Sequence, residues 1–386
     1  MQQQSSPAHW DIFCVVVDNY GDIGVTWRLA KQLAHEYQLT INLWVDDLRS
    51  FGHILPQLTP ELAEQTHEGV RILKWNDPLD IDYIPGSVLI EAFACELPAQ
   101  VKQALTAAAR PPVWLNLEYL SAEDWVEGCH GLPSFQPGGI NKYFYLPGFT
   151  EKTGGLICEQ DLLATRDAWQ ANPQNRARLF ADLGLTGIEP DHRIISAFSY
   201  ETTALSALCE LWSKAAQPMH LLLPKGRSLN SLTQWLPESP DKLTPGSHIQ
   251  LGALTLHILP MTDQQGYDRL LWSCDFNIVR GEDSFVRAQW AARPFIWHIY
   301  QQEDDYHLVK LEAFMRLYCD NLAPEVALCW QQLNLAFNCQ QQIDVQRLWL
   351  QIDTMRSELE AHAKHWPVDA LKTADLATRL VQFVKK

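Results

Sequence analysis

The stretch that decides the fold is FCVVVDNYGDIG, residues Phe13–Gly24. Its first half is a short apolar, β-branched run, which is typical of a buried parallel strand. Its second half is a turn rich in Asn, Asp and Gly, and residues 25–33 then carry apolar side chains at helical spacing. A strand, a turn and a helix in this order predict the opening unit of a doubly wound α/β domain.

Ligands of doubly wound domains bind beyond the carboxyl ends of the strands, and Asp18 and Asp22 lie there in this sequence. The turn is not G-x-G-x-x-G, and no acidic residue follows at the spacing of a dinucleotide site, which weighs against a dehydrogenase. One interpretation is structural: Asp18 closes the turn and Asp22 caps the helix. The other is chemical, because two carboxylates in one turn at a strand end can bind and deprotonate a substrate.

Composition excludes several classes of protein. The formal net charge is −16, which argues against a nucleic-acid partner because the phosphates would be repelled. Nine cysteines occur without a C-x-x-C pair or clustered histidines, so we expect reduced core cysteines, no metal site and a cytoplasmic location. The polar N-terminus lacks a signal segment, and no apolar run approaches the ~20 residues that span a bilayer, so we expect no membrane partner.

A chain of 386 residues is long for a single core, so we expect two domains. Strands and helices alternate up to about residue 120, and a polar segment near residue 188 precedes a second alternation. We therefore predict an N-terminal Rossmann-like domain over 1–188 and a C-terminal one over 189–366. An amphipathic helix at about 367–386 is expected to pack back on the first domain. Residues 116–160 interrupt the pattern and are expected to form a long functional loop.

The second domain contains a similar unit. A buried strand runs into Arg280-Gly281-Glu282-Asp283-Ser284, and a helix is expected to follow from residue 285. Free backbone N–H groups at Ser284, the helix dipole and the Arg280 guanidinium predict a diphosphate site. Glu282 and Asp283 would then accept hydrogen bonds from sugar hydroxyls. The alternative is a capped helix start with a local ion pair.

Two doubly wound domains with such turns favour a two-lobed nucleotide-sugar transferase, with two Rossmann-like domains facing a central cleft. The nucleotide would bind the second domain, and the acceptor and the base would lie on the first. A two-domain nucleotide-sugar or small-ligand binding protein is the alternative.

Both turns, together with residues 143–149, 153–155 and 267–272, resemble the EarP family of protein-arginine rhamnosyltransferases, in the same order over essentially the whole chain. The resemblance implies a GT-B fold and an inverting enzyme without metal or cofactor. It implies dTDP-β-L-rhamnose as donor and an arginine of translation elongation factor P as acceptor. A GT-B transferase with a different sugar and acceptor is the alternative.

The resemblance also implies roles for individual residues. Asp22 would be the catalytic base, Asp18 its orienting companion and Glu282 a further catalytic group. The substrate-binding residues would be Asn19, Tyr20, Gly21, Phe198, Tyr200, Gln264, Arg280, Asp283 and Ser284, with Gln264 chosen over its neighbour from its offset to Tyr267.

Overall fold

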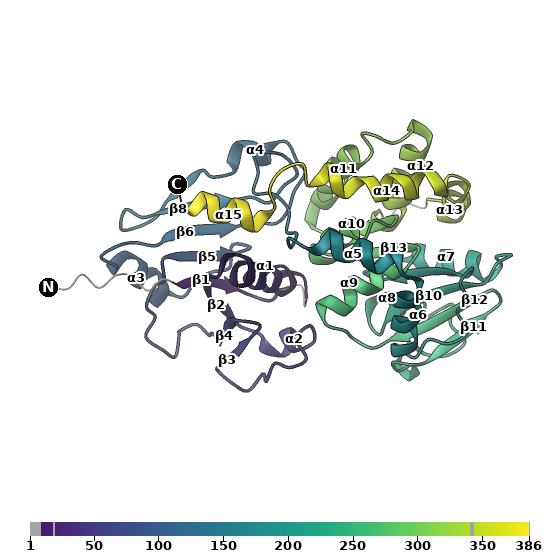
Figure 1. Ribbon diagram of the computed structural model, residues 1–386, viewed down its shortest axis with the longest axis horizontal. Helices are drawn as coiled ribbons and strands as arrows, with labels where there is room; N and C mark the ends of the chain where they lie inside the picture. The colour runs from purple at the N-terminus through teal and green to yellow at the C-terminus, as the bar shows by residue number, and fades with distance from the viewer. Residues whose placement is uncertain (1–8, 18–19, 340–342, 386) are drawn as a thin grey trace. The chain divides into compact units, whose positions relative to one another are not determined.

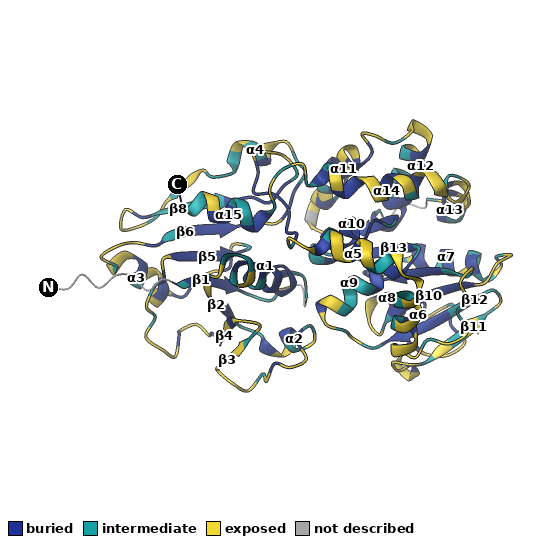
Figure 2. Ribbon diagram, in the orientation of Figure 1, coloured by how far each residue is buried: buried dark blue, intermediate teal, exposed yellow. Residues whose placement is uncertain are grey.

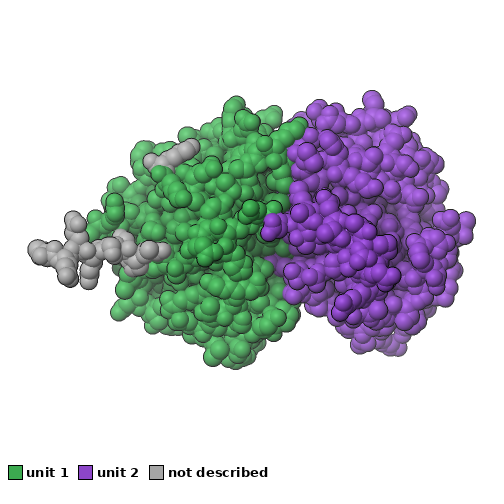
Figure 3. All heavy atoms as spheres, in the orientation of Figure 1, with its two compact units in different colours: residues 1–160, 370–386 green, residues 161–369 purple. Residues whose placement is uncertain are grey.

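The computed structural model describes residues 9–17, 20–339 and 343–385. The chain divides into two compact units, residues 1–160 with 370–386 and residues 161–369 (Figures 1 and 3). The division thus lies well before the expected boundary near residue 188. The reason is packing: helices α5 (Leu162–Ala171) and α6 (Pro173–Asp182) contact α9 (Gln264–Ser273) within the second unit. Trp169 of α5, for example, donates its indole N–H to Ser273 Oγ at 3.0 Å.

Unit 1 is an eight-stranded sheet in the order β3-β4-β2-β1-β5-β6-β8-β7. Only the edge strands β3 and β7 pair antiparallel among the described residues. Its elements are β1 (His9–Cys14), α1 (Gly21–Tyr37), β2 (Thr40–Val45), α2 (Leu48–Gly52), β3 (Glu64–His67), β4 (Val70–Lys74), β5 (Val88–Ala92), α3 (Ala99–Ala107), β6 (Val113–Leu117), α4 (Trp125–Cys129), β7 (Pro133–Phe135), β8 (Asn141–Tyr145) and α15 (Leu376–Val384).

Two local expectations for unit 1 were wrong. The first strand ends at Cys14 rather than continuing through the valines, because carboxylates take the next backbone N–H groups. Val16 N–H donates to Asp46 Oδ1 at 2.9 Å, and Val17 N–H donates to Asp22 Oδ2 at 3.0 Å. The segment 116–160 is not one long loop, since it contains α4 and the strands β7 and β8. The parallel pairing of β8 with β6 extends the sheet there.

Aromatic side chains fill the core on one face of the unit 1 sheet. The Phe13 and Trp44 rings of neighbouring strands stack at 5.2 Å between centroids, and Trp75 and Trp114 belong to the same buried cluster. Figure 2 shows the strand interiors as buried and the outer helix faces as exposed. The C-terminal helix α15 contacts α1, where Thr378 Oγ1 and the Tyr37 hydroxyl lie 2.6 Å apart.

Unit 2 is a six-stranded sheet in the order β11-β12-β10-β9-β13-β14, with β11 antiparallel at one edge. The remaining elements, which lie in this unit except for the last residue of α14, are β9 (Arg193–Ala197), α7 (Thr203–Ser213), β10 (Met219–Pro224), α8 (Arg227–Asn230), β11 (His248–Leu251), β12 (Leu254–Leu259), β13 (Phe276–Arg280), α10 (Asp283–Trp290), β14 (Phe295–His298), α11 (Tyr306–Tyr318), α12 (Pro324–Asn338), α13 (Val345–Thr354) and α14 (Arg356–Ala370). Two 3-10 turns, Pro240–Lys242 and Glu303–Asp305, complete it.

The strand orders fix where ligands can bind. β1 lies between β2 and β5, and β9 lies between β10 and β13. These are the points where the strand order reverses, and the crevice of a doubly wound sheet opens at such a point. Among the described residues, no helix has both the length and the apolar composition that a membrane crossing requires.

Candidate functional site

Asp22 lies at the switch point of unit 1, in the first turn of α1, and its side chain is buried. It does not cap the helix: the N-cap residue is Tyr20, which makes no side-chain capping bond. Both carboxylate oxygens of Asp22 bind groups from elsewhere in the chain. Oδ2 accepts from the Val17 N–H, and Oδ1 accepts from the Tyr119 hydroxyl at 2.9 Å. A buried carboxylate held at both oxygens has a fixed orientation, as a general base requires.

Two other expected residues flank Asp22. Gly21 is the first residue of α1, and the Tyr20 hydroxyl lies 3.4 Å from His53 Nδ1. Asp18 and Asn19 fall outside the described residues, so their roles stay predictions.

Arg280 lies at the switch point of unit 2, as the last residue of β13, and it is buried. Its guanidinium carbon lies 4.4 Å from the centre of the Phe198 ring and 4.9 Å from the centre of the Tyr200 ring. Both aromatic residues follow β9, the neighbouring strand. The structure therefore brings three of the expected donor residues together, with the two rings placed against the cation.

A second guanidinium faces these rings beside Arg280, because the Arg227 guanidinium carbon lies 5.5 Å from the centre of the Tyr200 ring, whereas the neighbouring histidine carries no charge. His298, at the end of β14, packs edge-on against Tyr200 at 5.3 Å between centroids. Burial, followed by the charges of Arg280 and His307, lowers the pKa of His298 to about 3. The imidazole is therefore neutral at physiological pH.

The expected residues Glu282, Asp283 and Ser284 form the N-terminus of α10. Glu282 is the N-cap, and Asp283 and Ser284 are the first two helical residues. Gly281 has φ 64°, a conformation that favours glycine, and its carbonyl accepts from Trp297 Nε1 at 2.8 Å. Helix N-termini attract anions, while Glu282 lies 4.0 Å from the Lys310 ammonium.

Gln264 is the first residue of α9 and is buried. One turn further on, Asp268 forms a buried bidentate ion pair with Arg287 of α10, at 2.9 Å and 2.6 Å. The pair joins the helix that begins with Gln264 to the helix that begins with Asp283. The N-termini of α9 and α10 are thereby held in one arrangement.

Comparison with known proteins decides the family. A family model described as "Elongation-Factor P (EF-P) rhamnosyltransferase EarP" matches residues 10–385. The chain belongs to the EarP family. Its activity is that of an arginine rhamnosyltransferase, a glycosyltransferase, as the resemblance implied.

The similarity to curated EarP relatives extends over the full length. A protein-arginine rhamnosyltransferase of Shewanella oneidensis MR-1 is 65% identical, covering 100% of both chains. One from Pseudomonas putida KT2440 is 48% identical over 98% of this chain and 99% of its own.

Solved structures confirm the expected GT-B fold. One solved structure is described as showing the structural basis for EarP-mediated arginine glycosylation of translation elongation factor EF-P. It matches this chain with a TM-score of 0.70 and 35% identity, covering 98% of this chain and 99% of its own. A glycosyltransferase from Rickettsia africae matches with a TM-score of 0.51 at 10% identity, over 99% and 98% of the two chains, and so shares the fold alone.

Tyr119 is the residue of this EarP site that sequence reasoning missed. Its place just after β6 was a usable signal, since the carboxyl end of a central strand borders the ligand crevice. Among the described residues, no group of three or more His, Cys, Asp or Glu side chains could hold a metal ion. The expectation of metal-independent transfer stays a prediction.

Proposed function

We propose that the chain transfers rhamnose from dTDP-β-L-rhamnose to an arginine of translation elongation factor P, with inversion at the sugar. The observation that carries this proposal is the chemistry of the two switch points. Unit 2 has a fixed cation, Arg280, before a helix N-terminus, and unit 1 has a buried, oriented carboxylate, Asp22. The cation and helix N-terminus of unit 2 suit an anionic donor, and the carboxylate of unit 1 suits a cationic acceptor.

The donor contacts follow from unit 2. Arg280 would bind the diphosphate, together with backbone N–H groups and the Ser284 hydroxyl at the start of α10. Negative charge develops on the diphosphate as it leaves, and these groups would stabilise it without a metal. Glu282 and Asp283 would accept hydrogen bonds from sugar hydroxyls, and Phe198, Tyr200 and Gln264 would contact the nucleoside.

The acceptor chemistry follows from Asp22. An arginine guanidinium has a pKa above ~12, so full deprotonation before attack is costly. We propose that Asp22 takes one guanidinium proton as the arginine nitrogen bonds to the anomeric carbon. The bond from that carbon to the diphosphate oxygen breaks, and its electron pair leaves with dTDP. Attack on the face opposite the leaving group inverts the anomeric centre.

The choice of acceptor is supported by the relatives. The solved structure with 35% identity concerns EarP-mediated glycosylation of an arginine of EF-P, and the family model carries the same acceptor in its description. A translation factor as acceptor would also place the reaction in the cytoplasm.

Intact-mass measurement of purified elongation factor P tests the proposal. The factor is incubated with the enzyme and, in separate reactions, with dTDP-β-L-rhamnose, dTDP-glucose or UDP-glucose. We expect one deoxyhexosyl group to be added with the first donor only. An acceptor variant with lysine in place of the modified arginine is the control and should stay unmodified. An unmodified wild-type factor, or efficient transfer from another donor, would contradict the assignment.

A further inference from the structure

Asp22 is held by a side chain that lies far away in the sequence. The Tyr119 hydroxyl donates to Asp22 Oδ1 at 2.9 Å across 97 positions of sequence. Tyr119 follows β6 and its side chain is 41% exposed, whereas Asp22 is 3% exposed. A tyrosine that reaches from solvent to a buried carboxylate at a ligand crevice needs an explanation beyond core packing.

The Tyr119 ring rests on an aromatic platform. It stacks on the Phe93 ring at 4.4 Å between centroids with 16° between the planes. Phe93 and its neighbour Ala94 have φ of 56° and 53°, a left-handed conformation that is strained for a non-glycine residue. Such strain persists only where surrounding contacts enforce it, and it is concentrated at functional sites.

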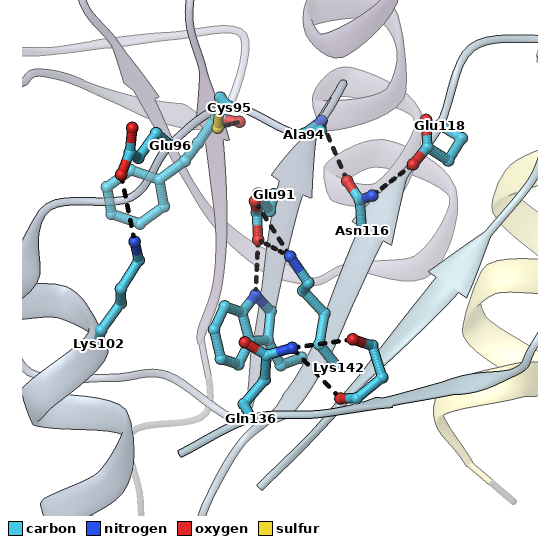
Figure 4. Close-up of polar contacts among 12 residues, drawn as sticks. Glu91, Ala94, Cys95, Glu96, Lys102, Asn116, Glu118, Gln136 and Lys142 are labelled. Atoms are coloured by element: carbon cyan, nitrogen blue, oxygen red, sulfur yellow. Dashed lines mark hydrogen bonds and ion pairs between the residues drawn. The ribbon is translucent and has the colours of Figure 1, made fainter.

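The surrounding contacts come from two strand ends. The Phe93 N–H donates to the Leu117 carbonyl at 2.6 Å, and the Ala94 N–H donates to Asn116 Oδ1 at 3.1 Å. Asn116 in turn donates to Glu118 Oε1 at 2.5 Å, a chain drawn in Figure 4. The carboxyl ends of β5 and β6 thus fix the platform under Tyr119.

From this arrangement we infer that Tyr119 is a positioning residue for the rhamnosyl transfer, acting through Asp22. The inference rests on the proposed function of Asp22 as base. The torsion that turns a carboxylate about its last bond is soft, so hydrogen bonds to both oxygens fix its plane better than a bond to one of them, and Val17 N–H binds Oδ2. The hydroxyl of Tyr119 binds the second oxygen and holds the carboxylate in one plane, ready for the guanidinium proton.

Unit 1 contains a matched pair that serves as a control. The Tyr83 hydroxyl donates to Asp11 Oδ2, also at 2.9 Å. Asp11 is fully buried in the middle of β1, where it pairs with Asn42 of β2. The two pairs share their chemistry and their length, but only the Tyr119 pair lies at the switch point.

The experiment compares Tyr119→Phe with Tyr83→Phe, measuring kcat, the KM for the donor and Tm for each full-length variant. Tyr119→Phe keeps the ring on Phe93 and removes only the hydroxyl. We expect kcat to fall about 10–100-fold with the KM for the donor unchanged. Tyr83→Phe should lower Tm and leave kcat at the wild-type value.

A double variant tests that Tyr119 acts through Asp22. In the Asp22→Asn background, Tyr119→Phe should change the residual rate by less than about twofold, because coupled residues are not additive. Wild-type kcat in Tyr119→Phe, or fully additive losses in the double variant, would overturn the inference while Asp22→Asn remains inactive. An active Asp22→Asn variant would instead overturn the role of Asp22, so the two failures are distinguishable.

Discussion

The two units of this EarP-family chain solve the same structural problem in different ways. Each must turn from a central strand into a helix, at β1–α1 in unit 1 and at β13–α10 in unit 2. In unit 1 a carboxylate from the helix, Asp22, reaches back and accepts the Val17 N–H of the turn. In unit 2 the strand ends in Arg280, and Gly281 makes the turn in a left-handed conformation. The Gly281 carbonyl accepts a hydrogen bond from Trp297 Nε1.

The difference shows how one architecture can serve substrates of opposite charge. A helix N-terminus favours an anion in either unit. In unit 1 the protein supplies that anion itself, as Asp22, so the turn is suited to a cation such as a guanidinium. In unit 2 the helix also begins with carboxylates, Glu282 and Asp283, but the strand before it ends in the cation Arg280. That cation suits a diphosphate, while the two carboxylates can accept hydrogen bonds from sugar hydroxyls. The predictions that follow test this division of roles.

The largest expected effect is on transfer. Asp22→Asn keeps the size and most hydrogen bonds of the side chain but removes the base, and loss of a general base costs ~10²–10⁴ in rate. Donor affinity should stay near the wild-type value because the residues proposed to bind the donor lie in unit 2. A transfer assay beside isothermal titration with the donor measures both quantities. A fully active variant would remove Asp22 from the chemistry.

The next effect concerns the ion pair that joins α9 and α10. Asp268→Asn breaks the buried ion pair with the Arg287 guanidinium, and breaking such a pair costs about 3–5 kcal/mol. Urea unfolding should show this loss in the free energy of unfolding.

The control for that variant is Glu210→Gln. Glu210 and Lys214 form an exposed pair at 2.8 Å, and exposed pairs contribute only about 0–1 kcal/mol. Equal stability losses in the two variants would show that burial does not set the strength of the Asp268–Arg287 pair.

The third effect is on donor binding. Arg280→Ala removes a charge-assisted contact worth about 1.5–3 kcal/mol, so donor affinity should fall roughly 10–150-fold. Arg176→Ala is the matched control, because Arg176 also faces an aromatic ring, Phe180 at 5.6 Å, on α6. Titration calorimetry should separate the two variants. Unchanged donor affinity in Arg280→Ala would mean that the diphosphate binds elsewhere.

The sequence predicted those features of the fold and of the candidate site that have a local sequence pattern. The buried strand before Arg280 and the turn around Asp22 are read from consecutive residues, so both doubly wound units and both switch points could be predicted. The pairing of Tyr119 with Asp22 and of Asp268 with Arg287 depends on tertiary packing, which no local pattern encodes. The observed boundary between the units differs from the expected one for the same reason. Helices α5 and α6 are amphipathic, and their sequence does not say which sheet they pack against.

The smallest expected effect concerns Asp11, another buried carboxylate of the same unit, and distinguishes its role from that of Asp22. Asn42, Trp44 and Tyr83 each donate a hydrogen bond to the Asp11 carboxylate, at 3.0, 2.9 and 2.9 Å. Its oxygens thus bind groups that close the core rather than groups at the ligand crevice. Asp11 should therefore contribute to stability and not to transfer.

The pH dependence of stability tests that role. Burial would raise the pKa of Asp11, but hydrogen bonds from His9, Trp44 and Asn42 and the nearby charge of His9 outweigh it, so the pKa lies below its ordinary value. A carboxyl group with a lowered folded pKa stabilises the protein above its unfolded pKa of about 4. That contribution is lost as the pH falls through the lower, folded pKa. Urea unfolding between neutral pH and about pH 3 should therefore show a fall below about pH 4, and Asp11→Asn should flatten that fall. An equally steep fall in the variant would show that other groups control acid stability.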